Sequence, residues 1–369
     1  MKILVACEYS GRVREAFRKL GHDAWSCDLL PSDDNSPYHI QGDVLELLDK
    51  GWDMMIAHPP CTYLANSGVQ HMWAGRKKEN GKNVALKLYN YPSHFSDYKV
   101  RREKFLNEPK IFELLKGHDH VVEAFEPEAT TKAKLNSDHV EIDFYTMELM
   151  AGNLQNYLES HPDDWKLESK LKVISQVCLA LEHSHEKRIF HRDLYTDNIL
   201  VKEKKEPLHV KVTDYGAAKT PKIPINTAYD FLLGARNISS PEALVGLISD
   251  DEGWKKNDVF ALGLLIYHII NKAPSYTQVV LMTAAQVTTK DPKVKEEHLK
   301  NKILPMIKNN MIVPLAITEL GIEDGKKRKI EAILNDVFLE ATKLDPNDRT
   351  SEISSIRTRM EECLGVLNA

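Results

Sequence analysis

Residues 191–200 read HRDLYTDNIL, and residues 212–216 read VTDYG. Asn198 follows Asp193 by five residues on the same short segment, and Asp214 stands two residues before a glycine. A carboxylate base and two hard oxygen ligands in this order are the groups that metal-assisted phosphoryl transfer requires. The pattern therefore predicts that Asp193 accepts the proton of an attacking hydroxyl, while Asn198 and Asp214 bind Mg²⁺ on a nucleoside triphosphate.

These two motifs resemble the catalytic and metal-binding loops of the eukaryotic-type protein kinases, and the resemblance extends over residues 83–363. It implies a bilobal α+β fold, ATP and Mg²⁺ as cofactors, and a protein as substrate. Residues 84–89 read VALKLY and are similar to the Val-Ala-Ile-Lys segment of that family. The resemblance makes Lys87 the cation that gathers the α- and β-phosphates.

Glu108 lies at the spacing that the family uses for the carboxylate partner of this lysine, within a helix predicted in residues 104–116. Pro109 follows it directly, and a residue before proline avoids the helical region of backbone space. Two alternatives are therefore open. Either the helix contains Glu108, or it begins at Pro109, which leaves Glu108 as the N-cap and Glu113 as the reserve partner.

Residues 147–150 read MELM at the end of an apolar-rich segment and resemble the hinge between the two lobes of a kinase. The resemblance implies that Met147 is the gatekeeper residue. It also implies that the backbone groups of Glu148 and Met150 bond the adenine edge of the nucleotide. Because these contacts use the backbone, they place no demand on the side chains.

Three later residues match scaffold positions of the same family. Asp258 would anchor the backbone of the catalytic loop, and Arg349 would pair with Glu242 of the segment Ser-Pro-Glu. A phosphate on the loop-like residues 217–240 would be a partner for Arg192. A charge-assisted pair of this kind would order the loop.

The kinase pattern also fails at definite positions. A Gly-x-Gly-x-x-Gly loop is expected about 15 to 20 residues before Lys87, but that stretch reads ANSGVQ, residues 65–70. We therefore expect the first two strands of the small lobe to be replaced. Tyr195 stands where Ser/Thr kinases have a lysine, and a neutral phenol lowers the expected rate. Tyr215 replaces a phenylalanine, and Ala235 replaces a threonine that usually bonds the catalytic aspartate.

The first 81 residues have a different character. Apolar runs at residues 3–6, 24–30 and 52–57 alternate with a helical pattern at residues 13–20, which predicts a parallel, Rossmann-like sheet. This segment resembles the opening half of phage and bacterial S-adenosylmethionine-dependent DNA methyltransferases. The resemblance places the cofactor at the turn of residues 7–11 and its ribose at Asp28.

The methyltransferase resemblance is partial. The family's Pro-Cys-Gln is Pro-Cys-Thr at residues 60–62, and nothing after residue 81 supplies the later strands. A methyltransferase needs its whole sheet to enclose the cofactor and a flipped base. We therefore interpret the segment as a folded appendage, and we favour Cys61 as a buried, inert thiol over Cys61 as a nucleophile.

Composition sets further bounds. The chain has 369 residues and a net charge of -5, so we do not expect nucleic acid as a partner, and the cations of residues 76–82 are interpreted as a solvated face. The five cysteines are scattered and never form a C-x-x-C pair, which favours a reducing cytoplasm. No window reaches the roughly 18 apolar residues of a membrane span, so no membrane association is expected. The sequence does not specify an oligomeric state.

The sequence thus predicts three parts: a truncated Rossmann-like segment at residues 1–81, a kinase small lobe at 82–150 without an evident glycine-rich loop, and a helical large lobe at 151–369. The favoured function is transfer of the γ-phosphoryl group of ATP to a protein hydroxyl, that of serine or threonine, with impaired activity. The first alternative is a pseudokinase or scaffold. The second is a remnant of a nucleic-acid methyltransferase.

Overall fold

The computed structural model describes residues 2–6, 9–47, 50–57, 72–76, 83–88, 98–135, 138–160, 165–223, 238–272, 291–308 and 314–369. The contacts divide the chain into two compact units, residues 1–71 and 72–369. Several sequence predictions fall outside the described residues: the turn at Cys7 and Glu8, the segment around Cys61, residues 65–70, and Ala235.

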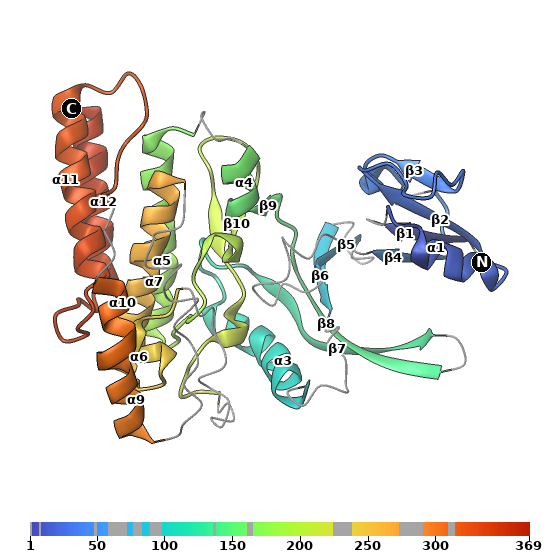
Figure 1. Cartoon of the computed structure of the whole chain (residues 1–369), viewed down its shortest axis with the longest axis horizontal. Helices are drawn as coiled ribbons and strands as arrows, with labels where there is room; N and C mark the ends of the chain where they lie inside the picture. Colours follow the sequence, from blue (N-terminus) through green and yellow to red (C-terminus); the bar gives the residue numbers. More distant parts are fainter. Residues whose placement is uncertain are drawn as a thin grey trace. The chain divides into compact units, whose positions relative to one another are not determined.

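The first unit contains a parallel sheet with the strand order β3-β2-β1-β4 (Figure 1). Its elements are β1 (Lys2–Ala6), α1 (Arg12–Lys19), β2 (Asp23–Asp28), β3 (His39–Gln41), the 3-10 turn η1 (Val44–Leu47) and β4 (Met54–Ala57). The apolar side chains of Ile3, Val5 and Ala24 form a small core that Val13 and Phe17 cover. The predicted alternation of strands and a helix is confirmed, whereas the three-residue β3 was too short to give a periodic signal.

The second unit begins with an antiparallel sheet of order β5-β6-β8-β7, built from β5 (Met72–Arg76), β6 (Asn83–Leu88), β8 (Asp138–Glu148) and β7 (Ala124–Leu135). Each residue of β5 pairs with β6, from Met72 opposite Lys87 to Arg76 opposite Asn83. A strand thus precedes the lysine strand, although the sequence placed a polar junction at residues 70–83 and a boundary after residue 81. A five-residue strand that contains a glycine gives too weak a pattern to separate from a loop.

Helix α3 (Tyr98–Leu115) packs beside this sheet and contains Pro109 in its interior. The alternative in which the helix begins at Pro109 is therefore wrong, and Glu108 is not an N-cap. Phe105, Ile111 and Leu115 are buried in the main core. Their burial offsets the roughly 3 kcal/mol that a proline costs inside a helix.

The rest of the second unit is mainly helical and is organised around α5 (Leu167–Glu186) and α7 (Asp251–Asn271), whose buried residues dominate the core. Figure 1 shows α11 (Asp324–Ala341) and α12 (Ile353–Asn368) as the outer pair of helices, and α12 packs on α5. The smaller elements are α4 (Leu154–Ser160), η2 (Thr196–Asn198), η3 (Tyr215–Ala217), α6 (Pro241–Leu244), α9 (Pro292–His298), η5 (Leu299–Ile303) and α10 (Leu304–Lys308).

A second antiparallel sheet carries the predicted catalytic segments into place. It consists of β9 (Gly152–Asn153), β10 (Ile199–Val201) and β11 (Val210–Val212), in the order β11-β10-β9. Because β10 follows Asn198 and β11 precedes Asp214, their pairing brings the two predicted metal ligands to the same end of the sheet. Among the described helices, none is both long and apolar enough to cross a membrane.

Candidate active site

Three chain segments meet at Lys87. Its ammonium lies 2.7 Å from Glu108 Oε2 of α3 and 3.2 Å from Asp214 Oδ1. All three side chains are buried, with at most 7% of any of them exposed. Burial alone would lower the pKa of Lys87, but the charges of Asp214 and Glu108 raise it above its ordinary value. The lysine is therefore held as a cation.

The same environment also raises the pKa of Glu108, which for a carboxyl favours the neutral form. Burial raises the pKa of Glu108 to about 7, and the nearby negative charge of Asp214 adds to this effect while Lys87 opposes it. Glu113 pairs instead with Lys116 at 3.3 Å on the exposed face of α3. Of the two carboxylates that the sequence offered as the partner of Lys87, the structure brings Glu108 to it.

Asp193 and Asn198 lie together in the catalytic loop. The Asn198 amide donates to the Asp193 carbonyl at 2.7 Å and to Asp193 Oδ2 at 3.4 Å. Both residues are buried. These bonds hold the Asn198 side chain through its nitrogen, and its oxygen has no hydrogen-bond partner among the described residues.

Asp258 of α7 holds the backbone of this loop. Its carboxylate accepts hydrogen bonds from the amides of His191 at 2.7 Å and Arg192 at 2.8 Å, and from His185 Nε2 at 2.9 Å. Burial would raise the pKa of Asp258, but the bond from His185 keeps it below its ordinary value. The sequence analysis did not identify this role of His185, because its partner Asp258 lies 73 residues further along the chain.

The loop is also joined to the segment of Asp214. His191 Nε2 lies 2.9 Å from the carbonyl oxygen of Thr213, and the His191 ring contacts Tyr215 at 4.5 Å between centroids. Tyr215 in turn meets Phe112 of α3 edge-on at 5.8 Å. Asp214 itself has a φ of 60°, a strained conformation for a residue with a side chain. This row of rings therefore couples α3 to both predicted metal-binding positions.

Three buried oxygens of the predicted site residues lack hydrogen-bond partners within the described part of the chain: Asn198 Oδ1, Asp214 Oδ2 and Glu108 Oε1. The first two belong to the predicted metal ligands. A buried oxygen without a partner is costly, so it usually marks a place for an ion or ligand. One amide oxygen and one carboxylate oxygen are ligands that Mg²⁺ prefers. The donor set therefore fits the metal that the sequence predicted.

The predicted hinge lies at the end of β8. Glu148 pairs with Val84 of β6, and its amide donates to the carbonyl oxygen of Glu123 at 2.9 Å. Its carboxylate accepts from Lys211. The Glu148 amide is therefore engaged within the protein. Met150 follows β8 and packs partly buried on the core.

Tyr195 lies partly buried beside the catalytic loop. Burial raises the pKa of its hydroxyl, and the carboxylates of Asp193, Asp197 and Asp214 raise it further. The phenol is therefore neutral at physiological pH. As the sequence indicated, Tyr195 brings no positive charge to the position where Ser/Thr kinases carry a lysine.

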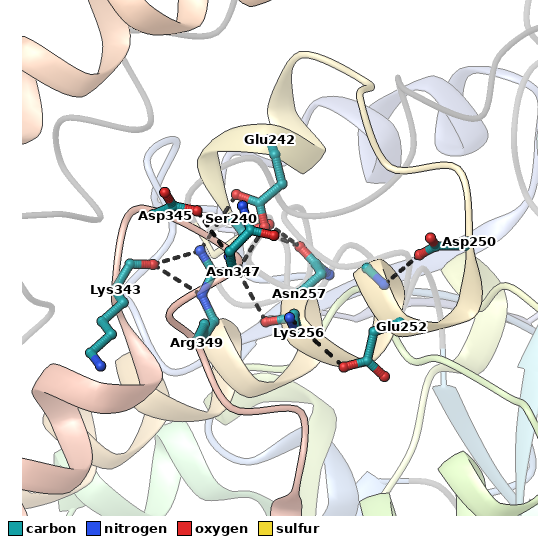
Figure 2. Close-up of polar contacts among 11 residues, drawn as sticks. Ser240, Glu242, Asp250, Glu252, Lys256, Asn257, Lys343, Asp345, Asn347 and Arg349 are labelled. Carbon is teal, nitrogen blue, oxygen red and sulfur yellow. Dashed lines mark hydrogen bonds and ion pairs between the residues drawn. The ribbon is translucent and has the colours of Figure 1, made fainter.

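The base of the large lobe contains the predicted scaffold pair. Arg349 donates to Glu242 Oε1 at 2.6 Å and Oε2 at 3.4 Å, and Figure 2 shows its guanidinium between this carboxylate and the backbone of Lys343 and Lys256. Ser240 bonds Asn257 of α7 through its amide at 3.0 Å and its hydroxyl at 3.1 Å. These bonds fix the end of the loop that follows Asp214.

These features define a phosphoryl-transfer fold of the protein kinase class. They are an antiparallel sheet with a buried lysine, a helix that supplies its carboxylate partner, and a loop with a base and two oxygen ligands. The family model for the protein kinase domain matches residues 69–359, and the chain belongs to this family. The match starts before residue 83, where the sequence resemblance began, because it includes β5.

Curated relatives agree with this assignment. A probable serine/threonine-protein kinase of Clostridium perfringens is 26% identical over 277 residues, which are 70% of this chain and 38% of that protein. Serine/threonine-protein kinase Pkn1 of Myxococcus xanthus is 24% identical over 303 residues, 82% of this chain and 37% of the relative. Human Nek10 is 29% identical over 246 residues, 61% of this chain and 19% of the relative. The chain thus spans less than two fifths of the length of these relatives. The comparisons give no support to a methyltransferase-like segment at residues 1–81.

Proposed function

We propose that this chain is an ATP-dependent protein kinase that transfers the γ-phosphoryl group to serine or threonine hydroxyls of a protein. The observation that carries the proposal is the buried contact of Lys87 with both Glu108 and Asp214, together with buried oxygens of Asn198, Asp214 and Glu108 that lack partners among the described residues. A structural ion pair would satisfy all its oxygens, whereas a site that awaits a metal–nucleotide complex leaves some unsatisfied. The names of the relatives favour serine and threonine over tyrosine.

In this mechanism Asp193 accepts the proton of the attacking hydroxyl, and the bond from Asn198 holds the loop that carries it. Lys87 orients the α- and β-phosphates, and Glu108 keeps the ammonium in place. Asn198 and Asp214 would hold Mg²⁺, which supplies positive charge to the phosphate oxygens when bound. The Glu148 carbonyl and the Met150 amide would bond the adenine edge.

The test is transfer of radiolabel from γ-labelled ATP to a mixed protein substrate such as casein, followed by phosphoamino-acid analysis. Asp193→Asn should reduce transfer by about 10²-fold or more, because the base is lost while its shape is kept. Glu113→Gln, on the exposed face of α3, is the matched control and should transfer normally. Equal transfer by Asp193→Asn and the wild type would contradict the assignment.

Tyr195 favours a second candidate function, a pseudokinase or scaffold that binds nucleotide without turning it over. The neutral phenol leaves the catalytic loop without the charge that steadies the transferring group. Thermal stabilisation by ATP and Mg²⁺ without detectable label transfer would establish this alternative. Transfer that disappears in Asp193→Asn would exclude it.

We also infer that the first unit, residues 1–71, forms a truncated Rossmann-like segment related to the opening half of S-adenosylmethionine-dependent DNA methyltransferases. The segment ends before the expected residue 81, because β5 belongs to the sheet of the second unit. The parallel order β3-β2-β1-β4 supports this, since ligands of such sheets bind at the carboxyl ends of the strands, where Asp28 ends β2. Titration calorimetry with S-adenosylmethionine tests it, and Asp28→Asn should abolish any binding. Because four short strands cannot enclose a cofactor and a flipped base, we do not propose methyl transfer.

A reducing compartment, the cytoplasm, is the proposed location. The thiols of Cys27, Cys178 and Cys363 are buried, and burial raises the pKa of Cys363 to about 12, so this thiol is chemically inert. Labelling of the native protein with a thiol reagent should therefore leave these three cysteines unmodified.

A further inference from the structure

A pocket of about 580 Å³ opens at the base of the large lobe, on elements that the proposed chemistry does not use. Its walls come from three separate parts of the chain: the turn after α6 with the start of α7, the end of α9 with η5 and α10, and the loop at residues 344–347. A volume of this size accommodates a small ligand or a few side chains of a peptide.

Arg349 joins two of the three walls, the one formed by α6 and α7 and the loop at residues 344–347. Its guanidinium bonds the Glu242 carboxylate, the Lys256 carbonyl at 3.3 Å, and the Lys343 carbonyl at 2.6 Å and 3.0 Å (Figure 2). The remaining wall is attached by Lys295 of α9, whose ammonium donates to the Gly246 carbonyl at 3.4 Å. The pocket is therefore preformed, which reduces the entropy lost when a ligand binds.

Apolar side chains from every wall line the pocket, and each is only partly buried. They are Leu247, Ile248, Leu299, Leu304, Leu344 and Pro346. Partly buried apolar side chains gathered around one cavity favour an apolar group that would cover them.

The charged groups of the pocket have an excess of carboxylates. Five carboxylates line it, against Lys256, Lys300 and the neighbouring Arg349. Arg349 neutralises Glu242, Lys256 lies 3.8 Å from Glu252, and Lys300 lies 2.6 Å from Glu296. The other two carboxylates, Asp250 and Asp345, accept bonds from the backbone amides of Gly253 and Asn347 and are exposed. The net charge at the rim is negative.

We propose that this pocket docks a segment of the protein substrate in which an apolar side chain is flanked by lysine or arginine. The apolar side chain fills the cavity, and the cations face the exposed carboxylates at its rim. The identification of the docked segment as part of a substrate rests on the proposed kinase activity. The pocket would raise the affinity for the substrate and would not touch the phosphoryl group.

The test begins with the full chain and an array of nine-residue peptides that have leucine at the centre and all other positions randomised, without ATP. Lysine and arginine should be enriched next to the leucine in the bound peptides. A fluorescein-labelled peptide made from the enriched sequence then gives the dissociation constant by polarisation. No enrichment, or enrichment of acidic residues, would overturn the proposal.

The rim variant Glu252→Lys with Glu296→Lys should weaken this peptide by at least about tenfold, with the largest effect at low salt. The matched control is Glu186→Lys with Glu340→Lys, which reverses two exposed helical glutamates outside the pocket. Leu304→Gln tests the apolar part and should weaken binding with an unchanged melting temperature. Equal binding by the rim variant and its control would overturn the proposal. Loss of binding in the rim variant that sedimentation traces to self-association of the protein would also overturn it.

Kinetics separate this inference from the proposed function. A substrate fused to the enriched peptide should have a KM at least about tenfold lower than the unfused substrate, with kcat unchanged, and the rim variant should remove the difference. Label transfer with no effect of the fusion would overturn the docking site alone. Peptide binding without any label transfer would overturn the kinase activity alone.

Discussion

Burial shifts the pKa values of two lysines of this chain with opposite net results. Lys87 in the sheet of the small lobe is 3% exposed, and Lys170 of α5 in the large lobe is 7% exposed. Two carboxylates contact Lys87 and raise its pKa, whereas burial lowers the pKa of Lys170 to about 8, with the positive charge of Lys272 adding to this. Among the described residues no carboxylate lies within ion-pair distance of Lys170; its ammonium lies 5.9 Å from the centroid of the Trp165 ring.

The two lysines differ in whether carboxylates contact the buried ammonium, and this contact distinguishes the lysine of the candidate site. Burial by itself lowers the pKa of a lysine, whereas carboxylates in contact with the ammonium raise it and keep the lysine charged over a wider pH range. At Lys87 those carboxylates come from α3 and from the segment before η3. One oxygen of each carboxylate and the amide oxygen of Asn198 stay unsatisfied within the described part of the chain. At Arg349, by contrast, the guanidinium bonds both oxygens of the Glu242 carboxylate and also the backbone carbonyl of Lys343. We interpret the first arrangement as a poised site and the second as scaffold.

The largest effect should come from breaking the scaffold pair. Arg349→Ala leaves Glu242 buried without its partner, so the free energy of unfolding should fall by about 3–5 kcal/mol. Denaturation in guanidinium chloride measures this. Arg359→Ala, which removes a partly exposed arginine 3.6 Å from Asp336, is the control and should change stability by less than about 1 kcal/mol. If the two variants were equally stable, the distinction between poised site and scaffold would be lost.

The poised lysine should matter more for activity than for folding. Lys87→Met removes the cation that orients the phosphates, and we expect label transfer to fall by about 10²-fold or more. Unfolding should be affected less than in Arg349→Ala, because Glu108, whose pKa is already raised to about 7, takes up a proton when the ammonium is absent. Lys116→Met, at an exposed pair, is the control. A variant that unfolds as readily as Arg349→Ala would make Lys87 scaffold as well.

The second lysine predicts a pH dependence of stability. The pKa of Lys170 is about 8 in the folded chain and 10.5 as the ordinary value, so the unfolded chain binds the proton more tightly. The stabilisation that the neutral amine provides is complete above pH 10.5 and is lost as the pH falls toward 8. Because Lys170 retains some contact with water, we expect a loss of about 2 kcal/mol. Lys170→Met should remove this slope, and the same slope in the variant would refute the assignment.

The smallest effect should come from adding a cation to the catalytic loop. Tyr195→Lys restores a positive charge close to Asp193 and Asp214, and we expect kcat to rise by roughly tenfold with little change in KM. Tyr195→Phe is the control, because it keeps the ring and removes the hydroxyl without adding charge. An unchanged or lower kcat in Tyr195→Lys would show that the phenol does not limit transfer.

Much of the site was predictable because its residues occur in three short motifs, at residues 84–89, 191–200 and 212–216. The positions of Lys87, Asp193, Asn198 and Asp214 followed from these motifs, and the structure brings them together; their roles stay predictions. Glu108 was one of two alternatives, since local backbone preference at Pro109 argued against a helix there. Packing of the buried face of α3 decided the matter, which no local rule includes.

What the sequence could not indicate depends on contacts between distant segments. Strand β5 is recognisable only through its pairing with β6, and the role of His185 requires Asp258, which α7 brings to it. The pocket at the base of the large lobe is built from segments about 50 residues apart, and nothing in any one of them marks it.

The sequence by itself determined the family, the chemical groups of the catalytic loop and the parallel strands of the first unit, because each depends on residue types at short, fixed intervals. The tertiary structure decided which carboxylate meets Lys87, which of two buried lysines has a raised pKa and which a lowered one, and where apolar and acidic surfaces combine. Those outcomes depend on desolvation and on distances of a few ångströms between segments that are remote in the chain.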